Sequence, residues 1–396
     1  MDNFEYYAPT RMIFGKDTHL KVGDIIRQYG FKKILFHYGR DSIKKSGLYN
    51  EVVNSLESAG IEYIDFGGAE PNPKLSLVEK GITVCRENNV EMVLAVGGGS
   101  VIDSSKLIAI GALSDVEPWK YSVKEAIPQK ALPVGTILTL AASGSEMSNS
   151  CVITNEDGWL KRGFSSDFNR PLFSICNPCL TYTVNPYQTA CGIVDIMMHT
   201  IERYFTTSEP VMLTDEIAEG LLRSVISAGK KVMENPCDYD ARANLMWAGS
   251  VSHNGITGAG TDFMMICHQL EHELSGRFDC VAHGAGLAVI FPAWAKYIYK
   301  HNVKRFVKFA VKVWGVSPES GSDEEIAFEG ISRCEKFFVS LDMPVRLCGL
   351  GINVTQEDID IMSEKCTNYG KRALPDYVEL KKAEIADIFK IAGEVL

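Results

Sequence analysis

Several features that would direct the interpretation are missing from this 396-residue sequence. No run of about 18 consecutive apolar residues occurs, so we expect no helix that spans a bilayer. The first residues, MDNFEYYAPTRMIFG, hold no basic segment followed by an apolar one, so we expect no signal peptide. Acidic residues outnumber basic ones, and the net charge of −10 argues against nucleic acid or an anionic membrane as a partner.

A regular cysteine framework is also missing. The 11 cysteines are scattered, and their number is odd. This distribution is typical of a reducing compartment, where thiols act as small buried apolar groups, and it predicts a cytoplasmic protein. Cys176 and Cys179 form an isolated CxxC, which we interpret as structural rather than as half of a zinc site or a redox pair.

The first 185 residues alternate between short apolar runs and amphipathic stretches. This alternation predicts an α/β, Rossmann-like domain with a parallel sheet and helices on both faces. The expected strands are Lys33–Tyr38, Ile61–Phe66, Met92–Val96, Pro133–Thr139 and Leu172–Ile175. The expected helices are Leu20–Tyr29, Leu48–Ala59, Leu75–Asn88 and Val101–Ala112.

After Asn185-Pro186 the pattern changes to long helical periods with almost no strand-like alternation. The expected helices include Tyr187–Tyr204, Thr214–Glu234, Tyr239–His253, Asp262–Leu274, Glu324–Leu341 and Gln356–Cys366. We therefore predict two domains, a dinucleotide-binding α/β domain over residues 1–185 and a helical metal-binding domain over residues 186–396. No internal repeat or low-complexity linker separates them, so we expect tight packing with a cleft between them.

A glycine-rich turn, Gly97-Gly98-Gly99-Ser100, follows a buried-type strand directly and precedes a helical pattern. Glycines let the backbone approach a ligand closely, and the first N–H groups of the helix suit a pyrophosphate. The spacing matches neither GxGxxG nor a P-loop, so a merely tight turn is the alternative. Ser100 and Asp103 have the spacing of a capping box.

A second loop of small residues follows a later strand and contains Thr139, Ser143, Gly144 and Ser145. Ligands of an open parallel sheet bind outside the carboxyl ends of its strands. Both loops are therefore expected to line one crevice, and together they indicate a dinucleotide.

The second half carries a candidate metal site. Asp195 and His199 are four residues apart and project from one helical face, and Glu202 extends this polar stripe. His268 and His272 repeat the spacing, and His283 follows in a segment that we predict to be a loop. An Asp–His hydrogen-bonded pair is the simpler alternative for the first two residues. Three imidazoles and one carboxylate suit Fe²⁺, Zn²⁺ or a similar ion and leave room for a substrate oxygen.

Together these motifs are recognisable: GGGSxxDxxK at Gly97–Lys106, SGSE at Ser143–Glu146, DxxxH, HxxxH and the His283-Gly284 pair. The sequence resembles the iron-containing (group III) alcohol dehydrogenases, in particular their butanol dehydrogenase-like branch. The resemblance covers nearly the whole chain and implies a dehydroquinate synthase-like fold. It implies a homodimer and a cofactor near Lys161. It also implies that the metal ligands are Asp195, His199, His268 and His283, with His272 as an unligated active-site histidine.

The choice of cofactor depends on the segment Gly39-Arg40-Asp41-Ser42, which follows the first strand. NAD-preferring members of this family resemble one another in carrying an aspartate in place of Arg40. An arginine, helped by Ser42, favours binding of a 2′-phosphate, so we predict NADP(H) over NAD(H). The alternative is that Arg40 is an ordinary solvent-exposed loop residue.

The resulting hypothesis is reversible hydride transfer between NADP(H) and a primary aliphatic alcohol or aldehyde, with one divalent ion, Fe²⁺ or Zn²⁺. His272 is expected to relay a proton or to hold a neighbouring group. Two alternatives remain. One is a metal-dependent lyase of the dehydroquinate synthase type, which needs basic residues where this sequence has chiefly apolar ones. The other is a dinucleotide-sensing protein whose metal only ties helices together.

Overall fold

The computed structural model describes residues 1–394. The chain forms two compact units. The first comprises Tyr7–Val184 and Cys237–Asn254, and the second comprises Met1–Tyr6, Asn185–Pro236 and the chain from Gly255 onward. The first break between the units thus lies one residue before the predicted boundary. However, the later segment Cys237–Asn254 belongs to the first unit, and Met1–Tyr6 belong to the second. The predicted assignment of cofactor and metal to separate domains stays a prediction.

The first unit is built on a six-stranded sheet in which all neighbouring strands are parallel. In spatial order the strands are β1 (Arg11–Phe14), β8 (Phe173–Cys176), β5 (Val134–Leu138), β4 (Met92–Gly97), β2 (Lys33–Tyr38) and β3 (Glu62–Phe66). All five predicted strands are present, which confirms the α/β class. The edge strand β1 was not predicted, because its residues are exposed or only half-buried and show no clear apolar period.

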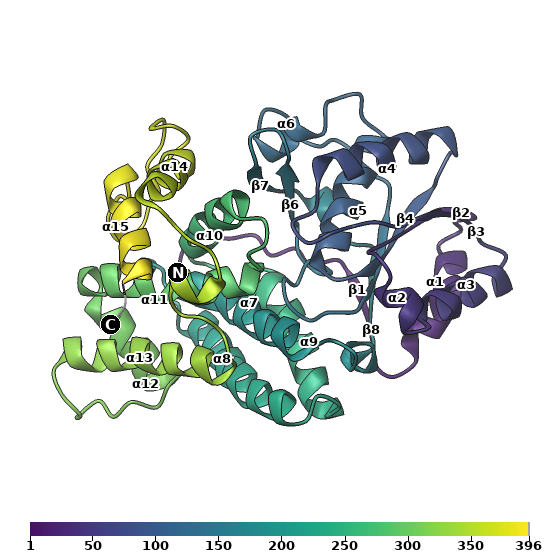
Figure 1. Cartoon of the computed structure of the whole chain (residues 1–396). Coiled ribbons are helices and arrows are strands. Elements are labelled where there is room, and N and C mark those ends of the chain that lie inside the picture. Colours follow the sequence, from purple (N-terminus) through teal and green to yellow (C-terminus); the bar gives the residue numbers. More distant parts are fainter. Residues whose placement is uncertain (395–396) are drawn as a thin grey trace. The chain divides into compact units, whose positions relative to one another are not determined.

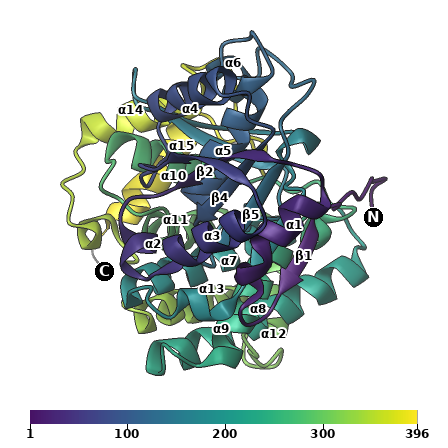
Figure 2. The ribbon, with the colours of Figure 1, turned by 90° about the vertical axis from the view of Figure 1, so that its right-hand side faces the viewer.

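Helices cover both faces of this sheet (Figures 1 and 2). Ile34, Phe36 and Tyr38 of β2 pack in one core with α1 (Val22–Gln28) and α3 (Leu48–Ser58). Leu35 points the other way and packs with α4 (Leu75–Glu87) and α5 (Gly99–Ala112). Successive side chains of a strand alternate between faces, so a strand covered on both sides carries apolar residues on both.

The strand order reverses at β2, which lies between β3 and β4. The carboxyl ends of β2, β4 and β5 are therefore neighbours, and the segments that begin at Gly39, Gly97 and Thr139 leave the sheet at one edge. In open parallel sheets this reversal point is where ligands bind.

The rest of this unit consists of shorter elements and one further helix. It contains α2 (Ser42–Lys45), α6 (Trp119–Ser122), an antiparallel hairpin of β6 (Ser150–Asn155) and β7 (Leu160–Ser165), and α9 (Tyr239–His253). The short 3-10 helices are Thr18–Lys21, Asp167–Asn169 and Pro178–Thr181.

The second unit is helical, which confirms the predicted class of the C-terminal part. Its helices are α7 (Pro186–Tyr204), α8 (Met212–Glu234), α10 (Ile266–Arg277), α11 (His283–Ile298), α12 (Val303–Lys312), α13 (Asp323–Ser340), α14 (Gln356–Cys366) and α15 (Lys382–Gly393). Short 3-10 helices lie at Ile256–Gly258, Tyr299–His301 and Leu347–Leu350. Asn185 caps α7 by accepting from the N–H of Gln188, and Pro186 occupies the first turn. From Thr189 onward α7 is buried on all sides because α8 and α11 pack against it.

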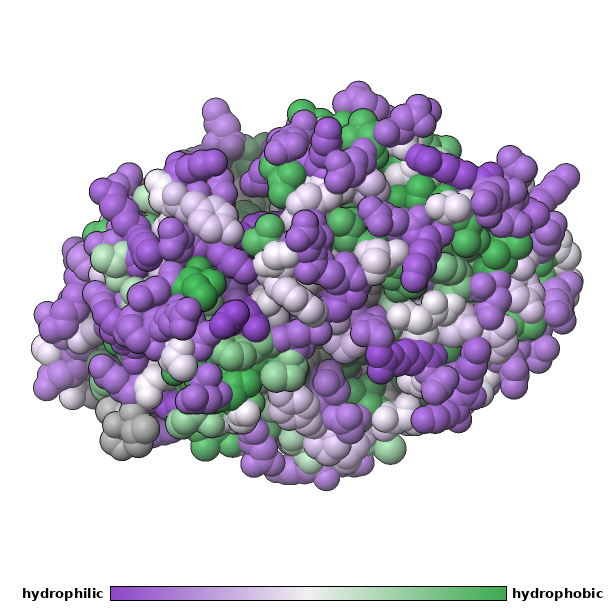
Figure 3. All heavy atoms as spheres, turned by 45° about the horizontal axis from the view of Figure 1, so that its top comes forward, coloured by the Kyte–Doolittle hydropathy of each residue, from purple (hydrophilic) through white to green (hydrophobic). Residues whose placement is uncertain are grey.

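Within residues 1–394 no helix has both the length and the apolar character needed to cross a membrane. On the face drawn in Figure 3, hydrophilic side chains predominate and the hydrophobic ones gather in small separate groups.

Candidate active site

Helix α7 presents Asp195 and His199 on one face, one turn apart. Both side chains are only 5% exposed. The Nε2 atom of His199 lies 3.4 Å from the Oδ1 atom of Asp195. The i, i+4 spacing in the sequence therefore gives the expected shared face.

Two more histidines bring Nε2 to the same carboxylate oxygen. The distance to Asp195 Oδ1 is 3.6 Å for His268, on α10, and 3.7 Å for His283. The prediction that His283 lies in a loop is wrong, because α11 begins at this residue. Gly284 makes this position possible, since a Cβ there would lie 2.2 Å from the carbonyl oxygen of Cys191 on α7.

The three distances from Asp195 Oδ1 to the histidine Nε2 atoms are long for hydrogen bonds and suit ligands of one shared ion. Asp195 Oδ1 and His268 Nε2 are buried and have no hydrogen-bond partner, an arrangement that is costly without a compensating group. Around an ion with ligand distances of about 2.1 Å, tetrahedral geometry separates two ligand atoms by about 3.4 Å. Asp195, His199 and His268 lie at the spacing of metal ligands, and His283 reaches the same carboxylate oxygen, so these residues suit a divalent ion. A donor set without thiolate suits Fe²⁺ or Zn²⁺.

The electrostatics of the cluster favour a cation. Burial disfavours the imidazolium form of His268, but the carboxylates of Glu202 and Asp195 outweigh this effect and raise its pKa to about 9. The same negative field that holds a proton attracts a divalent ion, which competes with that proton for Nε2.

Two buried glutamates contact the Nδ1 atoms of His268 and His283, the ring nitrogens that face away from Asp195. Glu202 Oε2 accepts from His268 Nδ1, and Glu271 Oε2 accepts from His283 Nδ1. Glu202 Oε1 also accepts from the backbone N–H of Cys267, at 2.5 Å.

His272 lies beside the cluster rather than among the groups that face Asp195. Its ring centroid is 5.6 Å from that of His283 and 6.4 Å from that of His268. Glu271, His272 and His283 form a second group with spacing compatible with a metal. A metal there would have to displace the proton between Glu271 and His283, so the group around Asp195 is the better metal site.

In the first unit, the glycine-rich turn connects β4 to α5 as expected. The helix begins at Gly99, and Gly98 is its N-cap, with no side-chain capping bond. The predicted capping box of Ser100 and Asp103 is therefore wrong, because the helix starts before Ser100. A Cβ at Gly99 would lie 2.4 Å from Ser143 Oγ. Glycine thus lets the turn touch the second small-residue loop, and the first N–H groups of α5 are placed to bind an anion.

The second loop is held from two sides. His253 Nδ1 of α9 bonds to the carbonyl oxygen of Ser143 at 2.7 Å. Gly144 has a φ of +63°, and a Cβ there would lie 2.5 Å from the Gly249 carbonyl oxygen. Thr139, at the start of this loop, donates its N–H to the Gly97 carbonyl at 3.1 Å.

A buried ionic network joins the loop to α5. Asp103 accepts from the Ser145 hydroxyl at 2.5 Å and from the Val152 N–H at 2.9 Å. Lys106 is fully buried and donates to Ser145 Oγ at 2.8 Å and to the Ser150 carbonyl at 2.7 Å. The predicted cofactor residue Asp103 is thus occupied with bracing this loop. Lys161, on β7 and 5% exposed, adds positive charge near Asp103.

Gly39 and Arg40 follow β2, and Ser42 begins α2. The Arg40 side chain is 70% exposed and forms an ion pair with Glu70. A ligand can reach the Arg40 guanidinium, but the Glu70 carboxylate already neutralises part of its positive charge.

Three residues of these sites were not assigned a role from the sequence, namely Glu70, Lys106 and Glu271, and Glu202 was noted only as extending the polar stripe of Asp195 and His199. Glu202 and Glu271 follow predicted ligands on the same helix by three residues. A carboxylate three residues after a predicted histidine ligand is the sequence signal that identifies a hydrogen-bond partner of a ligand.

A dinucleotide-type parallel sheet and a cluster of three histidines and a carboxylate, in one chain, are the parts that a metal-dependent oxidoreductase needs. The family model described as iron-containing alcohol dehydrogenase matches residues 9–178. The model described as Fe-containing alcohol dehydrogenase family, C-terminal, matches residues 189–393. The chain belongs to the iron-containing alcohol dehydrogenase family.

Individual relatives agree over nearly the full length. NADH-dependent butanol dehydrogenase A of Clostridium acetobutylicum is 40% identical, over 98% of this chain and 99% of the relative. NADPH-dependent aldehyde reductase YqhD of Escherichia coli is 36% identical, over 89% and 90%. The crystal structure of NADH-dependent butanol dehydrogenase A from Thermotoga maritima superposes with a TM-score of 0.95 at 39% identity, covering 100% of this chain and 99% of that one. The chain is thus a metal-dependent alcohol or aldehyde oxidoreductase that uses a nicotinamide cofactor, and neither the lyase nor the sensing protein gains support.

Proposed function

We propose that this enzyme catalyses reversible hydride transfer between NADP(H) and a primary aliphatic alcohol or its aldehyde. The observation that carries the proposal is the convergence of three imidazole nitrogens on Asp195 Oδ1. We assign four ligands to one Fe²⁺ or Zn²⁺ ion: Asp195, His199, His268 and His283. When bound, such an ion supplies Lewis-acid stabilisation of negative charge on a substrate oxygen.

Oxidation removes a proton from the alcohol oxygen and a hydride from its carbon, and the oxidised dinucleotide becomes NAD(P)H. We assign the proton to His272, which is partly exposed and lies beside His283. The competing assignment is a structural one, in which His272 only supports the ligand. H272A distinguishes them. Proton transfer predicts a lower kcat with an altered pH profile and normal metal content, and loss of metal with an unchanged profile contradicts it.

We propose that the first unit binds the dinucleotide and the second the metal. The cofactor residues are Gly39, Arg40, Ser42, Gly97, Gly98, Gly99, Ser100, Asp103, Thr139, Ser143, Ser145 and Lys161. Most belong to the segments that leave β2, β4 and β5 at one edge of the sheet. Asp103 and Lys161 contribute through the network beneath Ser145. The domain division proposed from the sequence, 1–185 and 186–396, is refined by adding Cys237–Asn254 to the dinucleotide-binding part.

The preference for NADP(H) depends on Arg40. Related enzymes are named both as NADH-dependent and as NADPH-dependent, so the family alone does not decide. R40A is expected to raise the KM for NADPH by about 10- to 100-fold, the equivalent of a charged hydrogen bond, with little change for NADH. E70Q is the matched control, because releasing Arg40 from Glu70 should lower the KM for NADPH. Equal effects of R40A on both cofactors would contradict the assignment.

We also propose a cytoplasmic homodimer. Cysteines that form no disulfide bond, many of them buried, suit a reducing compartment. The edge strand β1 and the exposed rings of Phe14 and Trp247 beside it offer a surface for a second copy. Sedimentation of the purified enzyme tests the dimer.

The central experiment combines metal analysis with a substrate panel. Enzyme of measured iron and zinc content is assayed with C2 to C8 alcohols and aldehydes and both dinucleotides. H268A should lose metal and turnover together, since it removes one imidazole from the cluster. Full activity of metal-free H268A would refute the proposed function.

A further inference from the structure

Two of the proposed ligands make the same contact on the side of the ring away from Asp195. The Nδ1 atom of His268 bonds to Glu202 Oε2, and the Nδ1 atom of His283 bonds to Glu271 Oε2. Both carboxylates are buried, with side-chain exposures of 2% and 0%.

An ionised carboxylate only accepts hydrogen bonds, so the ring nitrogen that faces it must carry the proton. In a neutral imidazole the other nitrogen then has a lone pair. We propose that Glu202 and Glu271 are positioning residues that fix the proton of His268 and His283 on Nδ1 and aim an unprotonated Nε2 at Asp195. The inference rests on the proposed function, because it concerns the ligands assigned there.

The surroundings are built to keep both carboxylates in place. Glu202 Oε1 accepts from the Cys267 N–H at 2.5 Å, which anchors the end of the side chain to α10 itself. Glu271 passes under α11 at Gly286, where a Cβ would lie 2.8 Å from Glu271 Cγ and 2.9 Å from its Oε1. Glycine is therefore required there for the carboxylate to reach His283.

The two positions respond differently to a neutral amide of the same shape. In E202Q the side-chain oxygen has to face the Cys267 N–H, which can only donate. The amide NH₂ group then faces His268 Nδ1, and this nitrogen must become the acceptor. The proton moves to Nε2, where it blocks metal binding. In E271Q the amide oxygen can turn toward His283 Nδ1 and accept a weaker hydrogen bond, with Nδ1 still the donor.

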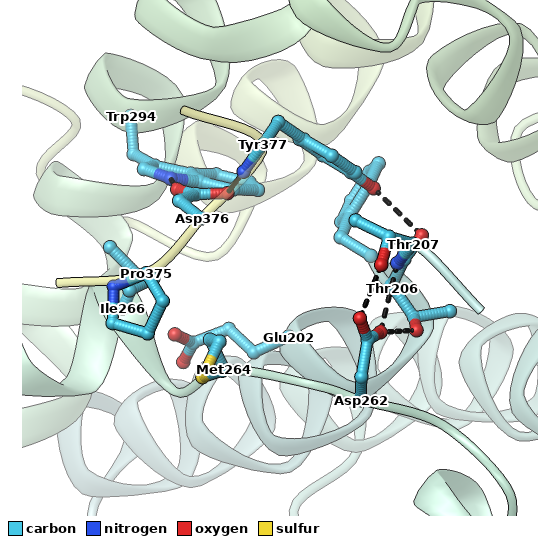
Figure 4. A pocket seen from close by; sticks show the side chains of 11 residues that line it. Glu202, Thr206, Thr207, Asp262, Met264, Ile266, Trp294, Pro375, Asp376 and Tyr377 are labelled. Atoms are coloured by element: carbon cyan, nitrogen blue, oxygen red, sulfur yellow. Dashed lines mark hydrogen bonds between the residues drawn. The ribbon is translucent and has the colours of Figure 1, made fainter. Parts of the chain in front are cut away.

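The pocket behind Glu202 provides a matched control. It is a cavity of about 140 Å³ that Glu202 and Asp376 both line, and Figure 4 shows their carboxyl groups in the same pocket. Asp376 accepts from Trp294 Nε1 at 2.7 Å. D376N removes a carboxylate from the same pocket without touching the bond to His268, so it separates the effect of pocket charge from that of the hydrogen bond.

The experiment measures Zn²⁺ affinity of the full-length enzyme by competition with a chelator, after metal removal and with near-ultraviolet circular dichroism as a check on folding. Loss of a carboxylate behind a metal-ligating histidine typically weakens binding by about 10- to 100-fold. We expect E202Q to lose affinity by about 100-fold, E271Q by about 10-fold, and D376N by less than threefold. Affinity of E202Q equal to that of the unmodified enzyme would overturn the inference, as would equal losses in E202Q and D376N.

A second readout tests the unmodified enzyme directly. In the Zn²⁺-loaded enzyme with ¹⁵N-labelled histidine, two Nδ1–H protons should be shifted downfield and protected from exchange by their carboxylates. E202Q should remove one of these resonances and E271Q should move the other. Two ordinary, rapidly exchanging Nδ1–H protons in the unmodified enzyme would refute the inference. If the unmodified enzyme binds no divalent ion, the proposed function itself fails, and the two failures are thereby distinguished.

Discussion

Replacing Gly284 with alanine should damage both the packing of α11 and the metal cluster. The added Cβ would lie 2.2 Å from the Cys191 carbonyl oxygen and 2.6 Å from its carbonyl carbon and Cα. These are backbone atoms of α7, so no side-chain rotation relieves the overlap. Reaching a normal contact requires the two helices to separate by about 1 Å.

The energetic cost follows from two opposing terms. Overpacking a well-packed core costs about 1–3 kcal/mol, and alanine in place of glycine in a helix returns about 1 kcal/mol at most. We expect G284A to lower the free energy of unfolding by up to about 2 kcal/mol. The effect on the cluster is larger in relative terms. A shift of about 1 Å at His283 exceeds the ±0.2 Å tolerance of metal–ligand distances, so Zn²⁺ affinity should fall by at least about 10-fold.

Urea unfolding of the metal-free enzyme measures the first quantity and chelator competition the second. G220A is the matched control, because Gly220 also lies inside a helix, α8, but a Cβ there would meet only Arg223 Nη2 at 3.9 Å. G220A should gain up to about 1 kcal/mol and keep its metal affinity. If G284A and G220A behave alike in both assays, the steric argument for the His-Gly pair is wrong.

Two further predictions concern buried charges. K106M should lower stability by about 3–5 kcal/mol, because it removes the nearest cation of the buried Asp103 carboxylate and leaves only the charge of Lys161. It should also weaken dinucleotide binding by loosening Ser145. Thermal unfolding and NADPH titration measure these effects, and an unchanged melting temperature would contradict the first. Burial raises the pKa of Asp376 from 3.8 to about 6. The folded state therefore binds more protons than the unfolded state between these values, and stability should fall by up to about 3 kcal/mol as pH rises through this window. Urea unfolding from pH 4 to 8 should show this slope in the unmodified enzyme and a smaller one in D376N.

The features predicted correctly from the sequence depend on local periodicity. The run KILFHY places apolar residues on both faces and forms the buried strand β2. Asp195 and His199 share a helical face because four residues complete one turn. The glycine-rich turn lies between β4 and α5, where an apolar strand gives way to a helical pattern.

The features that were missed depend on contacts between distant segments. Ser100 and Asp103 have capping-box spacing, yet the Asp103 carboxylate bonds to the Val152 N–H, 49 residues away. His283 was placed in a loop because Gly284 and Gly286 weaken a helical pattern. Neither the neighbour of Gly284 on α7 nor that of Gly286 on α10 is visible in a local pattern.

The first turn of α11 shows why its sequence, His-Gly-Ala-Gly, suits a metal cluster. Residues two apart in a helix point about 200° apart, toward nearly opposite sides. Gly284 accordingly faces the α7 backbone at Cys191, and Gly286 faces Glu271 of α10. The turn packs between α7 and α10, which carry the other proposed ligands. At each glycine, a Cβ would overlap with one of these two helices. His283 therefore reaches Asp195 and Glu271 from a single backbone position, with one ring nitrogen toward each.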